Sequence, residues 1–512
     1  MDALLPQLLS FPPHPEPAKP ISDSEYDKHI KNLVQHINTI PASKLISGVP
    51  GGGDLLDIID PSKNTLPYLY TLLAHIGGSA GKQKSGSISD TFHPGSALWQ
   101  KMLDFMERFD ERQIRYAGTE LRRLIDVTAI KAERVSQPWA AIPPIRSAIL
   151  RVDESSSTFT SSHTTFARLC LEARAYTAAL PVLDHNIFHF PPTTNKLAEN
   201  SMFPHLSSHH DSSSTFITPD SGLSAKLEYR HHLLYFLYGA LIFMGLKKWK
   251  RALLFLEIVI MSPVVSNVSK IQVDAYKKWV LVSLLYKGHP LDLPKTLSQQ
   301  ATKQYHAICK AYDGLAEVFK DGILNEESDQ RLIAEATAGE AWWAPDFNRG
   351  LIVQVIDAFR QFSVVQLGKT FAALTVADIA RRTSPDPNDY AGTGDYVIHL
   401  ISTGVLNATI TQPSNDPASW ILRFSDSASG PLSRTEEQQH QHLEKQTRKI
   451  KSLMEHIREA DRKLSLNKDY IAEAKKAKKT RLNDLEGGMD EGPWMAHSGD
   501  AYEHDEDMMA DL

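Results

Sequence analysis

The densest apolar stretch of the chain runs from Tyr229 to Pro263 and contains a run of 14 uncharged residues, 233–246. A helix needs about 20 apolar residues to cross a bilayer. Two histidines precede this run closely, and Lys247 and Lys248 follow it directly. The pattern therefore predicts a helix that is buried in a protein core rather than a membrane span.

A second helix is predicted from Trp249, because apolar residues recur at three- and four-residue spacing until Pro263 ends the pattern. Two helices joined by a short turn form a helical hairpin. Gly239, Trp249, Ala252 and Pro263 resemble the signature positions of a tetratricopeptide repeat, with a shift of about one residue. Such a hairpin cannot bury both of its faces alone, so we expect stacked neighbours.

Amphipathic segments on both sides supply these neighbours. Helices are expected over 24–40, 98–135, 139–152, 165–184, 269–288, 303–322 and 351–371. Strand-like alternation is nearly absent before residue 400, so the first 370 residues predict a helical solenoid. Segments rich in Gly, Ser or His interrupt it and are expected to be flexible loops or insertions: 47–54, 77–90 and 201–222.

The pattern changes after the solenoid. Thr375 is a suitable N-cap for a helix through LTVADIARRT, because Asp378 follows three residues later. A second helix, Asp395 to Gly404, ends at its glycine. VLNATITQ and SWILRFSD carry β-branched and aromatic residues and predict the two strands of a hairpin. Two short helices followed by a two-stranded wing indicate a winged-helix module.

The charges of this module argue against DNA binding. Between Asp378 and Asp426 there are six Asp but only three Arg, and the second helix contains His399 but neither Lys nor Arg. Phosphate contacts need clustered positive charge. Nucleic acid is therefore not the expected partner, and a protein–protein module is the better interpretation.

The second wing strand is the candidate contact within this module. Trp420, Ile421, Leu422, Arg423 and Phe424 could present a strand edge that pairs with another chain. The alternative is that Trp420, Leu422 and Phe424 cover the module's own core, while Ile421 and Arg423 face outward. For the aromatic residues alone, the second interpretation is favoured.

A heptad stripe marks the C-terminal region. Its a positions are Leu443, Ile450, Ile457, Leu464 and Ile471, and its d positions include Leu453, Ala460 and Ala474, with Gln446 and Asn467 as polar exceptions. The stripe predicts a helix over 432–486 whose narrow apolar face packs against a partner. The candidate partner-binding residues are Leu443, Ile450, Leu453, Ile457, Leu464 and Ile471.

The remaining faces of this helix are strongly basic, and we interpret them as solvated rather than as a nucleic-acid surface. A long helix folding back on its own domain is the alternative to a partner helix. Residues 487–512 contain many Asp and Glu but no Lys or Arg, and predict a disordered acidic tail.

Composition limits the partners and the cellular compartment that are expected for the chain. The chain has 512 residues and a net charge of −6, so no global basic field draws it to nucleic acid or anionic lipid. Its two cysteines, Cys170 and Cys309, are expected to be buried thiols in a reducing compartment. The N-terminal segment lacks a basic region and is interrupted by prolines, so it does not indicate a signal peptide.

Motifs for catalysis and cofactors are incomplete, so neither an enzyme nor a cofactor is expected. Gly81–Lys82 is followed by Gln83 where a phosphate-binding loop needs Ser or Thr. His440 and His442 form an H-x-H pair, the spacing with which a deneddylating or deubiquitinating metalloprotease binds zinc. Its downstream Ser and Asp would fall at Ile450 and Leu453, so the metal site lacks two of its residues.

A helical-repeat array fused to an acidic winged helix resembles the PCI-domain family of the proteasome lid, the COP-nine signalosome and the translation-initiation complex. Three segments, 235–263, 273–295 and 305–319, resemble the signalosome's subunit-three family more narrowly, as do 369–382 and 396–410. The likeness is good over 226–426 and weaker before that.

The resemblance implies a non-catalytic scaffold. The signalosome removes the ubiquitin-like modifier Nedd8 from cullins and so regulates cullin-RING ubiquitin ligases, with the metalloprotease on a different subunit. Partners would be other PCI-type subunits, held by winged-helix contacts and a C-terminal helical bundle, and indirectly the cullin-RING ligases. Location would be the nucleus and the cytoplasm. A PCI subunit of the proteasome lid or the translation-initiation complex, or a winged-helix nucleic-acid binder, are the alternatives.

The expected architecture is mostly α-helical, with a solenoid, a winged helix and a long C-terminal helix. The predicted parts are a Pro-rich segment (1–21), N-terminal helical repeats with flexible insertions (22–225), the helical-repeat part of a PCI domain (226–350), its winged-helix part (351–426), the heptad helix (432–486) and the acidic tail (487–512).

Overall fold

The computed structural model describes residues 4–13, 21–47, 53–77, 91–191, 205–210, 212–264, 267–320, 326–384, 386–425, 435–466, 470–473 and 475–476. The chain divides into two units, residues 1–434 and 435–512, which are considered separately. The first unit holds the helical repeats and a small sheet, and the second holds one long helix. The predicted mostly helical architecture is confirmed.

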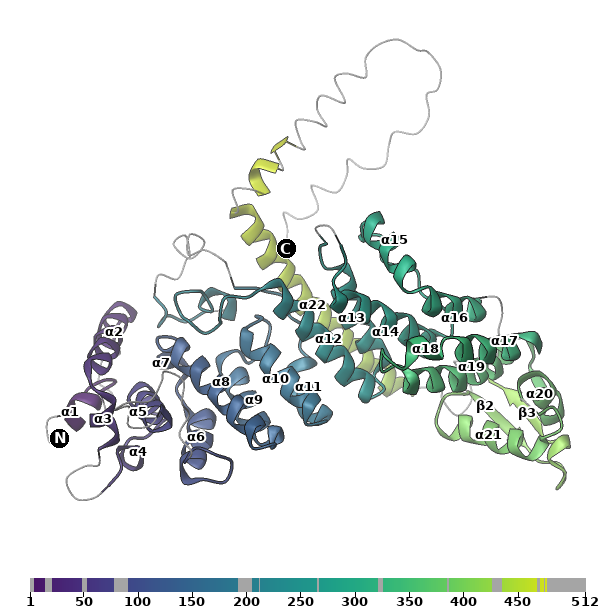
Figure 1. Ribbon diagram of the computed structural model, residues 1–512, viewed down its shortest axis with the longest axis horizontal. Coiled ribbons are helices and arrows are strands. Elements are labelled where there is room, and N and C mark those ends of the chain that lie inside the picture. The colour runs from purple at the N-terminus through teal and green to yellow at the C-terminus, as the bar shows by residue number, and fades with distance from the viewer. Residues whose placement is uncertain are drawn as a thin grey trace, which may run out of the picture. The chain divides into compact units, whose positions relative to one another are not determined.

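The N-terminal half of the first unit consists of helices packed in succession. They are α1 (Leu4–Leu8), α2 (Asp23–Thr39), α3 (Ala42–Ile46), α4 (Leu55–Ile58), α5 (Thr65–Gly77), α6 (Ala97–Arg108), α7 (Glu111–Ile114), α8 (Gly118–Arg134), α9 (Ile142–Val152), α10 (Ser161–Glu172) and α11 (Tyr176–Leu183), with a 3₁₀ turn at Pro138–Ala141. From α8 onward, successive helices lie side by side (Figure 1). Sequence reasoning missed α5, which is apolar on almost every side and so lacks the polar face that marks an amphipathic helix.

The predicted helical hairpin is confirmed as α12 (Tyr229–Gly245) and α13 (Trp249–Met261). Helix α12 is buried along most of its length. Gly239 lets the two helices approach closely, because a Cβ atom there would lie 2.5 Å from the Phe255 ring. The next helix, α14 (Lys270–Lys287), begins at a Ser269 capping box and ends at Gly288, whose φ is 70°.

The segment predicted as one helix over 303–322 is two helices, α15 (Gln299–Ile308) and α16 (Lys310–Lys320). They pack on different partners. Tyr305 stacks on Tyr276 of α14 at 4.8 Å between ring centroids, whereas Tyr312 donates to Asp346 at 2.7 Å. Helices α17 (Glu326–Ala338), α18 (Glu340–Trp343) and α19 (Arg349–Thr370) complete the solenoid.

The Ser- and His-rich insertion was predicted as a flexible loop, but its described part packs against the solenoid. Phe216, Ile217 and Leu223 are buried in the solenoid core. Ser213 donates to the buried carboxylate of Asp153 at 2.8 Å. The prediction of a flexible loop is therefore wrong for residues 205–210 and 212–222, because apolar residues within the polar stretch anchor it. The other two predicted loops lie mostly outside the described residues.

The winged helix is confirmed, with one strand more than predicted. Its elements are β1 (Ala373–Thr375), α20 (Val376–Thr383), α21 (Tyr390–Ser402), β2 (Ala408–Thr411) and β3 (Ile421–Phe424). As predicted, Thr375 caps α20, accepting from the Asp378 amide at 3.2 Å. The strands are antiparallel in the order β1-β3-β2, and the sheet lies beside α20 and α21 (Figure 1).

Helix α19 contributes to two separate hydrophobic cores. Ile352, Val355 and Phe359 belong to the solenoid core, and Val364 and Leu367 belong to the winged-helix core. The solenoid and the winged helix therefore share one continuous helix.

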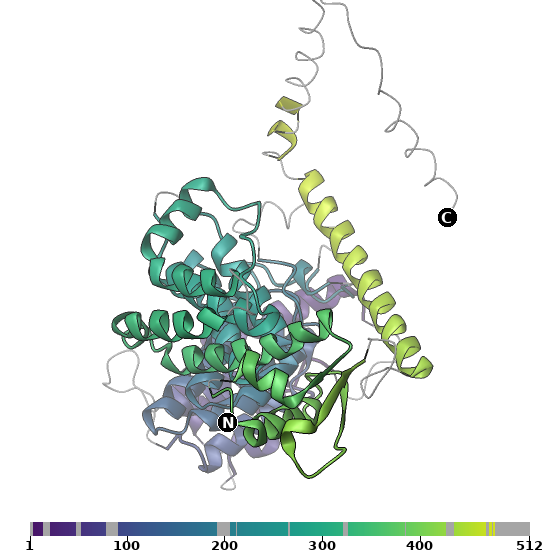
Figure 2. The same ribbon diagram turned by 90° about the vertical axis from the view of Figure 1, so that its right-hand side faces the viewer.

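The second unit contains α22 (Glu436–Leu466), which runs as one uninterrupted helix (Figure 2). Residues 470–473 and 475–476 are also helical. The predicted heptad helix is thus confirmed over this range, and its end and the acidic tail lie outside the described residues.

Candidate functional site

The five candidate residues of the wing do not form a sheet edge. Strand β3 pairs with β1 through Ala373↔Arg423 and with β2 through Thr409↔Arg423. Both sides of β3 are therefore occupied, and the outer strands of the described sheet are β1 and β2. The prediction that Trp420 to Phe424 offers an edge is wrong, because a third strand of only three residues, invisible as a pattern, takes that edge.

The side chains of β3 fit the alternative interpretation better. Leu422 is fully buried in the winged-helix core, and Phe424 packs against that core. Trp420 lies against Gly394 of α21, where a Cβ atom would be 3.0 Å from the indole. Arg423 is exposed and Ile421 is half-buried. These two side chains are not part of the winged-helix core.

The heptad stripe of α22 is exposed within the described residues. Leu443 is 64% exposed, and Ile450, Leu453, Ile457 and Leu464 are each more than two-fifths exposed. Ile471 is half-buried. Monomeric proteins rarely leave a continuous row of large aliphatic side chains in water. The stripe is the strongest candidate partner-binding surface on the molecule.

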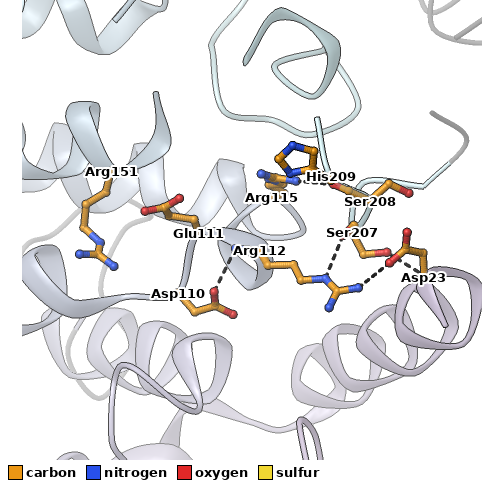
Figure 3. Close-up of a pocket in the computed structure, with 9 residues that line it drawn as sticks. All are labelled: Asp23, Asp110, Glu111, Arg112, Arg115, Arg151, Ser207, Ser208 and His209. Carbon is orange, nitrogen blue, oxygen red and sulfur yellow. Dashed lines mark hydrogen bonds and ion pairs between the residues drawn. The ribbon is translucent and has the colours of Figure 1, made fainter. Parts of the chain in front are cut away.

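A pocket of about 530 Å³ lies where the Ser- and His-rich insertion meets the solenoid, and it is lined by arginines and carboxylates (Figure 3). Arg112 donates to the Ser207 carbonyl at 2.9 Å and to Asp23 at 2.8 Å. Arg115 donates to the carbonyl oxygens of Leu206 and Ser208 at 3.0 and 3.1 Å.

The arginines of this pocket already donate hydrogen bonds to groups of the same chain. Arg151, the third, donates to the Phe109 and Glu107 carbonyls. Burial lowers the pKa of Arg115, which stacks over Phe216 of the insertion. The contacts in this pocket therefore hold the insertion against α2 and the α7 region. Sequence reasoning missed them because most of them are to backbone carbonyls.

A buried Ser–His pair lies nearby but lacks the geometry of a nucleophile and its base. The Ser156 hydroxyl is 2.9 Å from His163 Nε2, and both residues are buried. His163 Nδ1 accepts from the Thr160 amide at 3.2 Å. A neutral imidazole that accepts at Nδ1 carries its proton on Nε2 and so donates to Ser156 instead of accepting its proton.

The remaining reactive side chains are also buried. Cys170 and Cys309 are unpaired, as predicted, and burial raises the pKa of each thiol to about 12. No three or more His, Cys, Asp or Glu of the described residues are grouped so that they could hold a metal ion. His440 and His442 lie exposed on α22.

None of the helices in the described part of the chain has the length and apolarity that a membrane crossing requires.

Helix α18 and the irregular turn that follows it expose two aromatic side chains. Trp342 is 60% exposed, and Phe347 is 94% exposed with a φ of 57°. The turn is held from beneath, because Asp346 pairs with Lys277 at 2.7 Å and the buried Asn348 donates to Tyr312. Its display of aromatic rings is therefore fixed by the fold.

The chain is similar to known proteins along most of its length. The model of a family described as COP9 signalosome complex subunit 3, N-terminal helical repeats, matches residues 27–301. A protein named COP9 signalosome complex subunit 3 from Emericella nidulans is 36% identical over 424 residues, covering 83% of each chain. Its namesake from Dictyostelium discoideum is 25% identical over 467 residues, covering 91% of this chain and 96% of the relative.

A helical-repeat solenoid that shares its last helix with a winged helix places the chain among PCI-type proteins. The matching family model covers more than half of the chain, and the Emericella relative extends the similarity over most of the remainder. The chain belongs to the COP9 signalosome complex subunit 3 family, which confirms the family predicted from sequence.

Proposed function

We propose that the protein is a non-catalytic scaffold subunit of the signalosome, the complex that removes Nedd8 from cullins and so regulates cullin-RING ubiquitin ligases. The observation that carries the proposal is the exposed heptad stripe of α22 in a chain of the subunit 3 family. The relatives are named as subunits of the COP9 signalosome complex, which supports assembly with other subunits as the role of that stripe.

Two surfaces would serve this assembly. Leu443, Ile450, Leu453 and Ile457 would insert into a bundle with helices of other subunits, where an a/d stripe removes its apolar area from water. The winged helix would contact another PCI subunit through the outer strands β1 and β2, together with the outward side chains of β3. Cullin-RING ligases would be indirect partners.

The first experiment is native mass spectrometry of the tagged full-length chain purified from its own cells, beside a version that ends at Gly430. The full-length chain should carry several subunits, one of them a zinc-dependent deneddylase. The shortened chain should lose or loosen them. A full-length chain that is recovered alone, or with nucleic acid, would overturn the proposal.

The metalloprotease would be a different subunit. The purified chain should leave neddylated cullin intact with or without added zinc, while the complex that copurifies with it should cleave the modifier. Cleavage by the chain alone would contradict the non-catalytic role. We further propose that the protein occupies both nucleus and cytoplasm, which fluorescence microscopy of a tagged chain at native expression would test.

A further inference from the structure

A groove of about 1410 Å³ lies where the end of the solenoid meets the winged helix. Helices α14 and α17 contribute apolar side chains that include Tyr286 and Ile333, and α19 contributes Phe362. Helices α20 and α21 form the winged-helix wall. Ile333 is 54% exposed, so apolar surface lines the groove and remains in contact with water.

The groove also gathers positive charge that the fold leaves largely unpaired. Its cations are Lys247, Arg360, Arg381 and Arg382, against one carboxylate, Asp357. Among the described residues, Arg381 makes only a 3.9 Å contact with Asp378, and no ion pair involves the other three cations. Arg360 stacks over Tyr396 at 4.3 Å, and its Nε has no hydrogen-bond partner in the described structure.

Residues 487–512 have the complementary chemistry. They contain eight Asp or Glu and no Lys or Arg. They also carry Trp494, Tyr502 and four methionines, which are side chains that fill apolar grooves. An acidic, aromatic and methionine-bearing peptide matches a groove that is both basic and apolar.

The tail can reach the groove from any direction in which α22 points. The 31 residues of α22 span about 46 Å at 1.5 Å per residue. The 36 residues from 477 to 512 can extend to roughly 120 Å. Covalent attachment also gives the tail an effective concentration that a free peptide would need millimolar amounts to match.

We propose that the acidic C-terminal tail, residues 487–512, binds in the groove between the solenoid and the winged helix of the same molecule. The docked tail neutralises the unpaired cations and covers the apolar floor. It also occupies the winged-helix face formed by α20 and α21, so any partner that uses this face must first displace it. This inference does not depend on the proposed signalosome role.

The test is photo-cross-linking in the full-length chain. A benzoylphenylalanine is placed at Ile333 in one variant and at Tyr286 in a second, and a third carries it at the exposed Trp139, which does not line the groove. A mixture of isotopically heavy and light chains distinguishes links within one molecule from links between two. Mass spectrometry should find the groove probes linked to 487–512 of the same molecule, and the Trp139 probe should yield at least tenfold fewer such links.

Charge reversal then tests the chemistry. Arg381→Glu with Arg382→Glu should reduce the tail links at least fivefold, since both side chains are exposed and reversing their charge removes the attraction for the acidic tail. Arg423→Glu is the matched control, because it reverses an exposed arginine of the same module outside the groove, and it should leave the yield unchanged. Circular dichroism verifies that each variant is folded.

Other results overturn the inference. Links only between heavy and light chains would mean that a second copy supplies the occupant. Links from both groove probes to a different segment, or no links from either probe, would mean that the tail does not bind there. A yield that falls with Lys475→Glu and Lys476→Glu, but not with the paired arginine reversal, would place the tail on the basic helix instead.

Discussion

At the scale of the residue, Gly239 sets how closely α12 and α13 pack. A Cβ atom there would lie 2.5 Å from the Phe255 ring, which is itself buried. Gly239→Leu should therefore lower the free energy of unfolding by about 1–3 kcal/mol through overpacking. The measurement is the shift of the urea-unfolding midpoint, followed by circular dichroism.

Gly350 provides the matched control, since it also lies in a helix but no atom lies within 4 Å of its Cβ position. Gly350→Ala should leave stability unchanged or raise it by about 1 kcal/mol, because alanine favours the helix. Equal destabilisation by both substitutions would mean that close packing against Phe255 does not explain the effect at Gly239.

His163 should make stability depend on pH. Burial lowers the pKa of its imidazole to about 4, from about 6.5 when unfolded. Between these values the unfolded chain binds a proton that the folded chain does not. Stability is therefore full above pH 6.5, falls as the pH drops towards 4, and loses on the order of 3 kcal/mol over that range.

The measurement is the urea midpoint between pH 7.5 and pH 5, compared for the native chain and His163→Asn. The variant should show the flatter pH dependence, because its amide does not titrate. His399→Asn, at an exposed position of α21, should keep the native slope. Identical slopes for all three chains would show that another group controls this dependence.

Residue-level prediction from the sequence succeeded where one side chain has one local partner, and failed where the partner is distant. The Thr375 cap and the Gly288 helix end depend on neighbours within four residues, so the sequence alone located them. The Asp153–Ser213 contact joins residues 60 positions apart, and no local sequence pattern predicts it.

At the scale of the element, α22 shows how much structure can be predicted from a heptad stripe of apolar residues. The seven-residue spacing predicted both the helix and its apolar face, because these properties follow from helix geometry alone. The wing shows the limit, because β1 has three residues and its pairing with β3 depends on the folded module.

Removing the α22 stripe should abolish assembly without unfolding the chain. In the free chain Leu443, Ile450 and Ile457 are exposed, so changing all three to serine removes little buried area. In a helical bundle each would contribute about 1.5–3 kcal/mol, so copurifying subunits should be lost by more than a hundredfold. Native mass spectrometry gives the assembly and circular dichroism the stability.

The matched control for the stripe lies on the same helix. Ser452→Glu changes an exposed position off the heptad seam and should leave the copurifying subunits unchanged. Loss of assembly in the control as well would mean that the charge of the helix, and not its apolar seam, holds the partners.

At the scale of the whole molecule, α19 links the solenoid to the winged helix. One helix supplies Phe359 to the first core and Val364 to the second, with Gln361 between them. The sequence placed a boundary at residue 351, close to the start of this helix, because a change in pattern marks where a new motif begins and not which cores a helix contributes to.

Gln361→Pro should uncouple the two cores. Proline removes one hydrogen bond from the middle of α19 and clashes with the preceding turn, at a cost of about 3 kcal/mol. Among the described residues, eight buried side chains form the small winged-helix core and offset this cost, so its amides should exchange faster while those of α13 keep their protection. Hydrogen exchange followed by mass spectrometry measures both. Gln361→Ala should change neither region, and equal acceleration in α13 and β3 of the proline variant would show that the two cores unfold as one.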